Sequence, residues 1–287
     1  MNRISTFALV CWAALQSFVV SSGCKITQCT ETAADGATSK KDHCLSAEPT
    51  IEYREGTPRI ASETWSPGRA VSIINHNGPL RVDVDTTLEG RVTVSGIAFT
   101  REVASEVGKQ NATDRLAQTA APSLTVDDLG HIAIDAPGQG VVDGYDLTVR
   151  LPPAFDGALK IDAQNGKLTL LGADRAEKTT ATAHGIVAHN LRNAIHLTST
   201  VGEIEVSALP SGGGNFIHSE VGNIRATIGL ANLAITAKTA LGRVTFPPSW
   251  SATMVTADGL SGTVNLGDAS GSLAVTTENG NIDFSLP

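Results

Sequence analysis

A glycine recurs at nearly constant spacing through the second half of this 287-residue chain. The intervals between successive glycines of the series are 19, 17, 20, 20, 20 and 18 residues. Self-similarity with a period near 20 residues is typical of stacked structural copies rather than of one closed sheet. The glycines of the series are Gly166, Gly185, Gly202, Gly222, Gly242, Gly262 and Gly280.

Apolar and polar residues alternate on both sides of these glycines, which predicts a strand before and after each one. Around Gly222, for example, Ile217 lies five positions before, the small Ser219 three before and Ile224 two after. We expect the small residues to narrow the interior and their hydroxyl groups to bond along the stack. The residues two positions after the glycines are Leu168, Val187, Ile204, Ile224, Val244, Val264 and Ile282.

The pattern predicts an all-β fold, a parallel β-helix or β-solenoid with about 18–20 residues per coil. Each strand would pair in parallel with its equivalent in the next coil, roughly 4.8 Å away. The glycine would form the corner of the coil, because positive φ is easiest without a Cβ. Gly78 has the same surroundings and is an eighth predicted corner. Asn–Gly pairs also mark antiparallel hairpins, but the regular spacing favours coils.

The segment before the series is less regular. Residues 58–158 are expected to form an irregular β part that caps the solenoid, and residues 159–287 to form its coils. Residues 101–120 are the best helix candidate, so we expect one short helix.

The chain begins like an export signal. Arg3 precedes a mostly apolar run over residues 4–20 and then the sequence "SSGC". Residues 1–23 are therefore predicted to be a signal peptide, and Cys24 to be the lipidated first residue of a lipoprotein. Ordinary cleavage after Gly23 is the alternative. Residues 24–57 are polar, with little periodicity, and are expected to form a flexible tether.

The four cysteines bear on this choice. Cys11 would leave with the signal peptide, and lipid on Cys24 would leave Cys29 and Cys44 as one pair that an oxidising compartment could join. Without the lipid, Cys24, Cys29 and Cys44 would all remain as thiols, and one of the three would have no cysteine left to pair with. The segment has too few ligands for zinc, so no metal is expected.

Four pieces of the sequence, in this order, resemble a bacterial domain family of unknown function often labelled "putative adhesin". They are "WSPGRAVSIINHNG" from Trp65 to Gly78, "DLTVRLPP", the glycine-centred coils, and "VTFPPSWSATMVTADGLSG". The resemblance covers residues 60–287. It implies a β-solenoid on an exported or membrane-attached protein, and it implies no catalytic site.

The best candidate for chemistry comes from the outward positions of the predicted coils. Four positions before successive glycines, a column would place His218, Lys238 and Asp258 next to one another, with Glu220 on the same face as His218. Such a column could bind a sugar or an anion, or do acid–base work. The alternative is a solvated polar face without a ligand. The net charge of −8 argues against a nucleic-acid partner, and no nucleotide loop or other cofactor motif is present.

We therefore expect a non-enzymatic, lipid-anchored protein of the cell envelope with adhesin-like binding of a glycan or an envelope protein. A polysaccharide-active β-helix enzyme that uses His218, Lys238 and Asp258 is the alternative, and a purely structural envelope element is a third reading. Lys25 after the lipid cysteine, in place of Asp, favours the outer membrane if the source is Gram-negative.

Overall fold

The computed structural model describes residues 30–32, 38–40, 49–139, 142–229, 232–257 and 259–287. The chain divides into two compact units, Met1–Pro49 and Thr50–Pro287. In the first unit, β1 (Thr30–Thr32) pairs antiparallel with β2 (Thr38–Lys40). The predicted signal peptide and the four cysteines lie outside the described residues. All that follows concerns the second unit.

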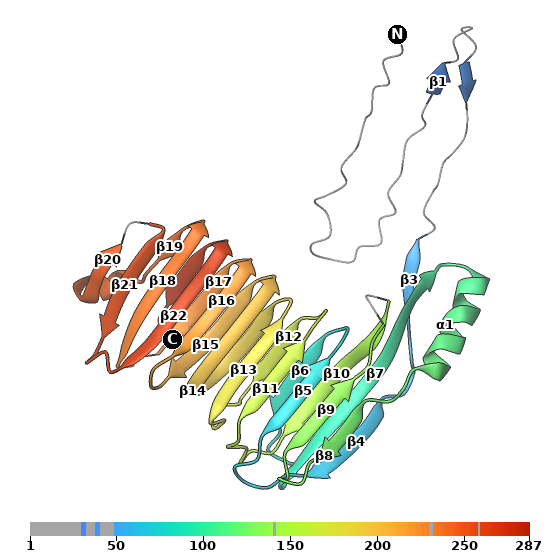
Figure 1. Ribbon diagram of the computed structural model, residues 1–287, viewed down its shortest axis with the longest axis horizontal. Helices are drawn as coiled ribbons and strands as arrows, with labels where there is room; N and C mark the ends of the chain where they lie inside the picture. The colour runs from blue at the N-terminus through green and yellow to red at the C-terminus, as the bar shows by residue number, and fades with distance from the viewer. Residues whose placement is uncertain (1–29, 33–37, 41–48, 140–141, 230–231, 258) are drawn as a thin grey trace. The chain divides into compact units, whose positions relative to one another are not determined.

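The second unit is predominantly β, as the sequence predicts, and the 21 strands among its described residues form one continuous, curled sheet (Figure 1). The sheet is built from stacked layers, each made of two strands joined by a sharp corner. We call the strands before the corners the leading flank and those after them the trailing flank. Strand β14 (Ile186–Val201) belongs to both, because it leaves one layer and enters the next without a break.

The leading flank consists of parallel strands in register. In stacking order its strands are β9 (Ile132–Ala136), β5 (Val71–Asn75), β11 (Leu159–Ala163), β13 (Lys178–Ala183), the second half of β14, β16 (Asn215–Val221), β22 (Gly271–Asn279) and β18 (Leu233–Leu241).

The trailing flank follows the same order and is also parallel. Its strands are β10 (Asp143–Leu151), β6 (Leu80–Val84), β12 (Leu168–Leu171), the first half of β14, β15 (Ile204–Pro210), β17 (Ile224–Ile228), β23 (Ile282–Ser285) and β19 (Val244–Thr245).

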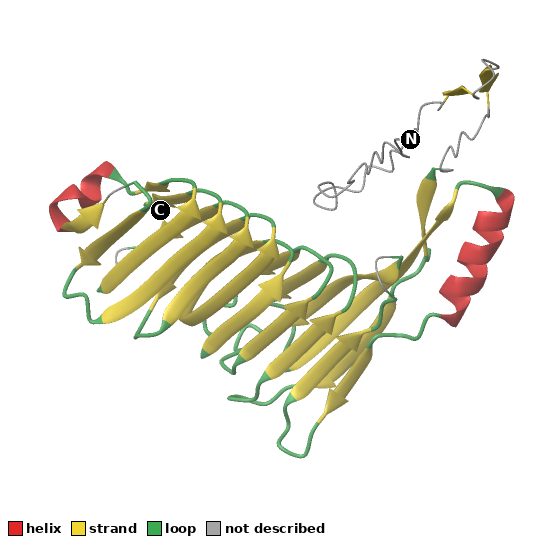
Figure 2. Ribbon diagram, turned by 45° about the horizontal axis from the view of Figure 1, so that its top comes forward, coloured by secondary structure: helices red, strands yellow, loops and turns green. Residues whose placement is uncertain are grey.

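Antiparallel strands close both ends of the stack. At one end they are β7 (Arg91–Val103), which pairs with β10, β3 (Thr50–Arg54) and β4 (Arg59–Thr64), and β8 (Ser123–Val126), which pairs with β9. At the other end they are β21 (Ser261–Leu266), which pairs with β18, and β20 (Met254–Ala257). The helix α1 (Glu106–Gln118) follows β7 and confirms the expected helix, and the 3-10 helix η1 (Pro248–Thr253) follows β19 (Figure 2).

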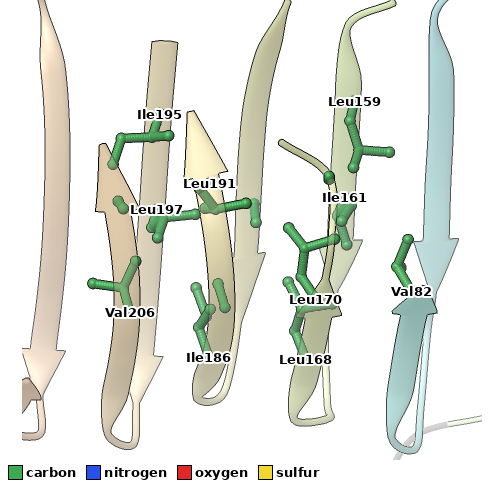
Figure 3. Close-up of a cluster of buried hydrophobic side chains, with 14 of the residues drawn as sticks. Val82, Leu159, Ile161, Leu168, Leu170, Ile186, Leu191, Ile195, Leu197 and Val206 are labelled. Atoms are coloured by element: carbon green, nitrogen blue, oxygen red, sulfur yellow. The ribbon is translucent and has the colours of Figure 1, made fainter. Parts of the chain in front are cut away.

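The interior consists of columns of apolar side chains, one from each layer (Figure 3). On the trailing flank the register runs Leu147, Leu80, Leu168, Ile186, Ile204, Ile224, Ile282, Val244, and all of these residues are buried. On the leading flank it runs Ile134, Ile73, Ile161, Ala181, Leu197, Ile217, Val275, Ala237, also all buried. The predicted inward ladders are therefore present.

The corners need glycine because neighbouring layers approach each other there by their backbones. A Cβ on Gly222 would collide with the carbonyl oxygen of Gly202, and a Cβ on Gly280 would collide with that of Gly222. Both glycines also have positive φ, 151° and 158°. The close approach is the stronger requirement, since it also applies at Gly166, against the carbonyl of Gly78, where φ is not positive.

Small polar residues three positions before the corners satisfy these carbonyl groups. The hydroxyl of Thr277 donates to the Gly222 oxygen (3.0 Å), and that of Thr239 donates to the Gly280 oxygen (2.8 Å). Ser199 and Ser219 both donate to the Gly202 oxygen, at 3.2 and 3.3 Å. All four side chains are buried, so the predicted hydroxyl bonding along the stack is confirmed.

Two predicted corners differ from the sequence interpretation. Gly262 is not a corner, because it lies inside β21 and pairs with Ala237 of β18 in antiparallel register. Gly185 is a corner, but only Gly185 and His184 separate Ala183 from Ile186. The other glycine corners of the stack have four residues between the equivalent strand positions. The shorter corner places Ile186, instead of the predicted Val187, in the apolar column.

The order of the layers also differs from the order of the chain. The last layer, β22–β23, lies between β16–β17 and β18–β19, so β16 and β18 are not neighbours. Likewise β5–β6 lies between β9–β10 and β11–β12. The expected direct contact of Ile224 with Val244 is therefore wrong, because Ile282 lies between them.

Aromatic side chains gather towards the ends of the stack. Phe246 stacks on Phe284, with 5.0 Å between the ring centroids and a 6° angle between the planes, and Trp250 of η1 lies 5.9 Å from Phe284. At the opposite end, Trp65 packs on Phe155 at 5.4 Å. Phe284 belongs to β23, one layer before the last, so large rings fit inside near the ends, whereas the buried side chains of the middle layers are aliphatic or small.

The first prediction concerns the corner contact. We expect Gly222→Ala to lower the free energy of unfolding by about 2–4 kcal/mol, because the new methyl group meets the rigid backbone of the neighbouring layer. Gly56→Ala is the matched control, since nothing lies within 4 Å of a Cβ there. Urea unfolding of both variants measures the difference, and equal effects would contradict the corner contact as the cause.

The second prediction concerns the hydroxyl column. Thr277→Val keeps the shape of the side chain but removes the donor to the Gly222 carbonyl group, so we expect a loss of about 1–2 kcal/mol in the free energy of unfolding. Thr236→Val, on the exposed face of the same flank, should change this quantity by less than about 0.5 kcal/mol. Thermal and urea unfolding test the pair. A Thr277 variant as stable as the wild type would show that the hydrogen bond contributes nothing.

Candidate functional site

The outer face of the leading flank carries the residues that the sequence singled out. Strand alternation turns His218 outward between the buried Ile217 and Ser219. Its neighbours in register are Thr198 on β14 and Thr276 on β22, and Thr276 is followed by Lys238 on β18. We call these four residues the His218 column.

The predicted adjacency of His218 and Lys238 is wrong, and the predicted adjacency of Lys238 and Asp258 is not tested. Thr276 separates His218 from Lys238, because the β22–β23 layer is inserted between their strands. The two residues are therefore two rungs apart, roughly 9–10 Å. Asp258 lies outside the described residues. Glu220 lies two positions after His218 and is exposed, as alternation requires.

The His218 column offers hydrogen-bonding groups and one cation. The Nδ1 atom of His218 lies 2.8 Å from the Thr276 hydroxyl oxygen. Lys238 is exposed, and within the described ranges neither it nor Glu220 has an ion-pair partner. The next outward column adds an aromatic pair, His196 and Phe216, with ring centroids 4.7 Å apart.

This arrangement offers hydrogen-bonding, charged and aromatic groups to a ligand. The imidazole of His218 and the ammonium group of Lys238 are separated by the hydroxyl group of Thr276, so the side-by-side pair that the enzymatic alternative needs is not formed. Across the part of the chain that the structure describes, no three His, Cys, Asp or Glu side chains are grouped so that they could hold a metal ion. Donors, a cation and an aromatic ring in parallel rows fit a hydroxyl-rich or anionic ligand.

A second polar region lies on the trailing flank, where two adjoining hollows share Gly172 and Asn190. Asp83 and Asp85 line one of them and form ion pairs with Arg81 and Arg150, respectively. The hydroxyl and amide groups of Thr87 donate to Asp85 and hold the pKa of this carboxyl group below its usual value. Calcium takes about six to eight oxygen ligands, and these two carboxylates, each already paired with an arginine, offer fewer.

On the same flank, Glu205 of β15 and Arg225 of β17 are neighbours in register. The ion pair of Arg225 is formed with Glu203 instead, at 2.9 Å. Asp283 of the inserted layer is the next neighbour of Arg225 in register. This column is a row of alternating charge on an exposed face.

Sequence reasoning missed a partly buried charged cluster beneath α1. The carboxylate of Asp143 accepts a hydrogen bond from Thr100 and lies 3.4 Å from the Arg115 guanidinium group, which also contacts Glu102 at 2.6 Å. Asp143 is only 8% exposed. The cluster fastens the helix to β7 and β10. No local motif could have revealed it, because its members come from separate elements.

Comparisons with known proteins give weak similarities. No family model and no curated protein matches the chain. A solved "putative cell adhesion protein" from Clostridium sporogenes is 14% identical, with a TM-score of 0.44 over 80% of this chain and 100% of that one. A "putative adhesin" from Bacteroides fragilis is 8% identical, with a TM-score of 0.28 over 80% and 98%. Another, from Parabacteroides merdae, is 9% identical, with a TM-score of 0.21 over 80% and 97%.

Helices that could cross a membrane are not found in the described part of the chain, where α1 spans 13 residues and is largely polar.

Proposed function

We propose that this protein is an exported, lipid-anchored component of the cell envelope whose β-solenoid body binds a partner in the manner of an adhesin. The observation that carries the proposal is the parallel register, in which each layer adds one rung to outward columns of polar side chains. A repeated flat face of this kind is suited to contact with an extended ligand. The similar solved proteins bear names of the same kind, at similarities too low to carry an argument.

We also propose that the stacked, predominantly β fold is a β-solenoid. Leading strands pair with leading strands and trailing strands with trailing strands, and both runs advance by one rung per layer. A coil of this solenoid would contain two strands, a glycine corner, and a return segment such as residues 172–177. The antiparallel strands at both ends would then act as the caps that solenoids need.

The proposed ligand surface is the His218 column with the aromatic pair beside it. Lys238 supplies an exposed cation, and the hydroxyl groups of Thr198 and Thr276 supply donors and acceptors at the spacing of the strands. An acidic glycan matches this chemistry, since its carboxylate can contact the cation while its hydroxyl groups meet the polar rows. We propose a binding role without catalysis, because His218 and Lys238 of the enzymatic alternative are not adjacent.

The third prediction tests this surface. On a panel of immobilised acidic and neutral glycans, we expect the full chain to bind acidic glycans, and Lys238→Glu to weaken that binding by about tenfold through charge reversal. Lys160→Glu is the matched control, since Lys160 is an exposed lysine on β11 of the same flank, several layers away. Equal loss in both variants would indicate general electrostatics, and no binding to any glycan would refute the glycan ligand.

The anchor is proposed on Cys24 by the sequence alone. An exported lipoprotein would retain the unit Thr50–Pro287 at the membrane through the polar segment before it. If the source is Gram-negative, Lys25 favours the outer membrane as the location. The remaining Cys29 and Cys44 would then be free to form one disulfide.

The fourth prediction tests the anchor. Cells that express the full chain and receive a palmitate analogue should label the protein, and Cys24→Ser should abolish the label. Cys29→Ser should leave the label intact, because only the residue after the cleavage site is modified. An unlabelled wild-type protein would refute lipidation and favour ordinary cleavage after Gly23.

A further inference from the structure

The last layer of the chain fills an interior position of the stack. β22–β23 pairs in register on both sides, with β16–β17 and with β18–β19. Val275 therefore lies between Ile217 and Ala237, and Ile282 between Ile224 and Val244. Without residues 271–285 these two neighbouring layers would be separated by an open slot one layer wide.

Only a layer with certain residues at and near its corner can fill this slot. Its corner position must be glycine, because Gly280 is in backbone contact with both Gly222 and Gly242. The Gly280 amide donates to the Leu241 oxygen (2.8 Å), and the Gly222 amide donates to the Asn279 oxygen (2.9 Å). The hydroxyl of Thr277 also fits, three positions before the corner. A second copy of this chain carries a segment with all of these features.

The connection to the inserted layer is short and strained. Leu266 at the end of β21 and Gly271 at the start of β22 both pair with Leu233, on opposite sides of β18. Residues 267–270 must therefore pass around the beginning of β18. We call residues 267–270 the hinge. In the hinge, Ala269 has a φ of 52°, a left-handed conformation that is unfavourable for a residue with a Cβ.

We propose that β22–β23 is an exchangeable layer that joins two copies of this chain, each inserting residues 271–285 into the slot of the other. The closed monomer and the exchanged pair would contain the same strand contacts, so they would differ mainly in the hinge. An exchanged hinge can relax Ala269 to negative φ. A short, strained hinge is the feature that favours such exchange.

The exposed end of the stack fits this arrangement. Five Cα steps join Leu266 to Gly271, a span of at most roughly 18 Å, so the slots of two exchanged copies would have to lie close together. Leu241 and Leu260, near the corner of the terminal layer, are 67% and 49% exposed. The Thr239 amide donates to the Leu260 oxygen, which places both leucines in one region. A second copy would cover this apolar surface.

The test uses two differently tagged full-length copies produced in the same cells, each with serine at the four native cysteine positions. One copy carries Arg225→Cys and the other Asp283→Cys, at positions that are neighbours in register across β17 and β23. A short bis-maleimide then joins two copies wherever β23 of one lies beside β17 of the other. The matched control combines Arg225→Cys with Glu205→Cys, which are neighbours within the part that does not exchange.

We expect the first pair to give about tenfold more covalent heterodimer than the control, because exchange raises the effective concentration of one thiol near the other. Ala269→Gly in both copies should lower that yield by roughly five- to tenfold, since it relieves the strain of the closed hinge. Equal yields from the two pairs would overturn the proposal. A yield that Ala269→Gly leaves unchanged would contradict the role of the hinge.

Discussion

The fold depends on one backbone contact, in which the corner of each layer meets the corner of the next. The carbonyl oxygen of Gly202 occupies the space where Gly222 would carry a side chain, and the carbonyl oxygen of Gly222 does the same to Gly280. The contact fixes the vertical spacing and the register together, because a slip of one residue would bring a Cβ against a carbonyl group and turn the apolar columns outward. Glycine is therefore required at these corners because the neighbouring backbones approach closely, as much as because φ is positive.

Around this contact the interior is graded from polar to apolar. Next to the corner, Thr277 and Thr239 give their hydroxyl groups to the corner carbonyl groups, which would otherwise be desolvated without a partner. In the β5–β6 layer Asn75 has the same role. Its side-chain amide donates to the carbonyl oxygens of Gly78 and Tyr145, at 2.9 and 3.2 Å. Further from the corner the columns are aliphatic. Aromatic residues are scarce for a separate reason, because large rings fit inside only near the ends of the stack.

The sequence was sufficient for most of what lies within one layer, and the exception is the short Gly185 corner, which puts Ile186 in the apolar column in place of Val187. Spacing alone predicted the strands on both sides of Gly202, Gly222 and Gly280, the inward aliphatic residues and the hydroxyl column. It failed where chain order and stacking order differ. Gly222 and Gly242 are 20 residues apart, as directly stacked corners would be, and a periodic pattern contains no information on which copies are neighbours. For the same reason the His218 column was predicted with Lys238, not Thr276, next to the imidazole. Gly262 has the apolar spacing of a corner, but its strand runs antiparallel as an end cap.

The insertion of the last layer links the outer surface to the integrity of the stack. His218 and Thr276 are 58 positions apart in sequence, and Arg225 and Asp283 are equally distant, yet each pair forms one continuous patch. A ligand on the His218 column must therefore contact the inserted layer, and it would stabilise every form in which the slot is filled. A filled slot presents the same column in a monomer and in an exchanged pair. Such a ligand would consequently oppose opening of the layer without favouring either assembly, since equal affinity for two states shifts no equilibrium between them.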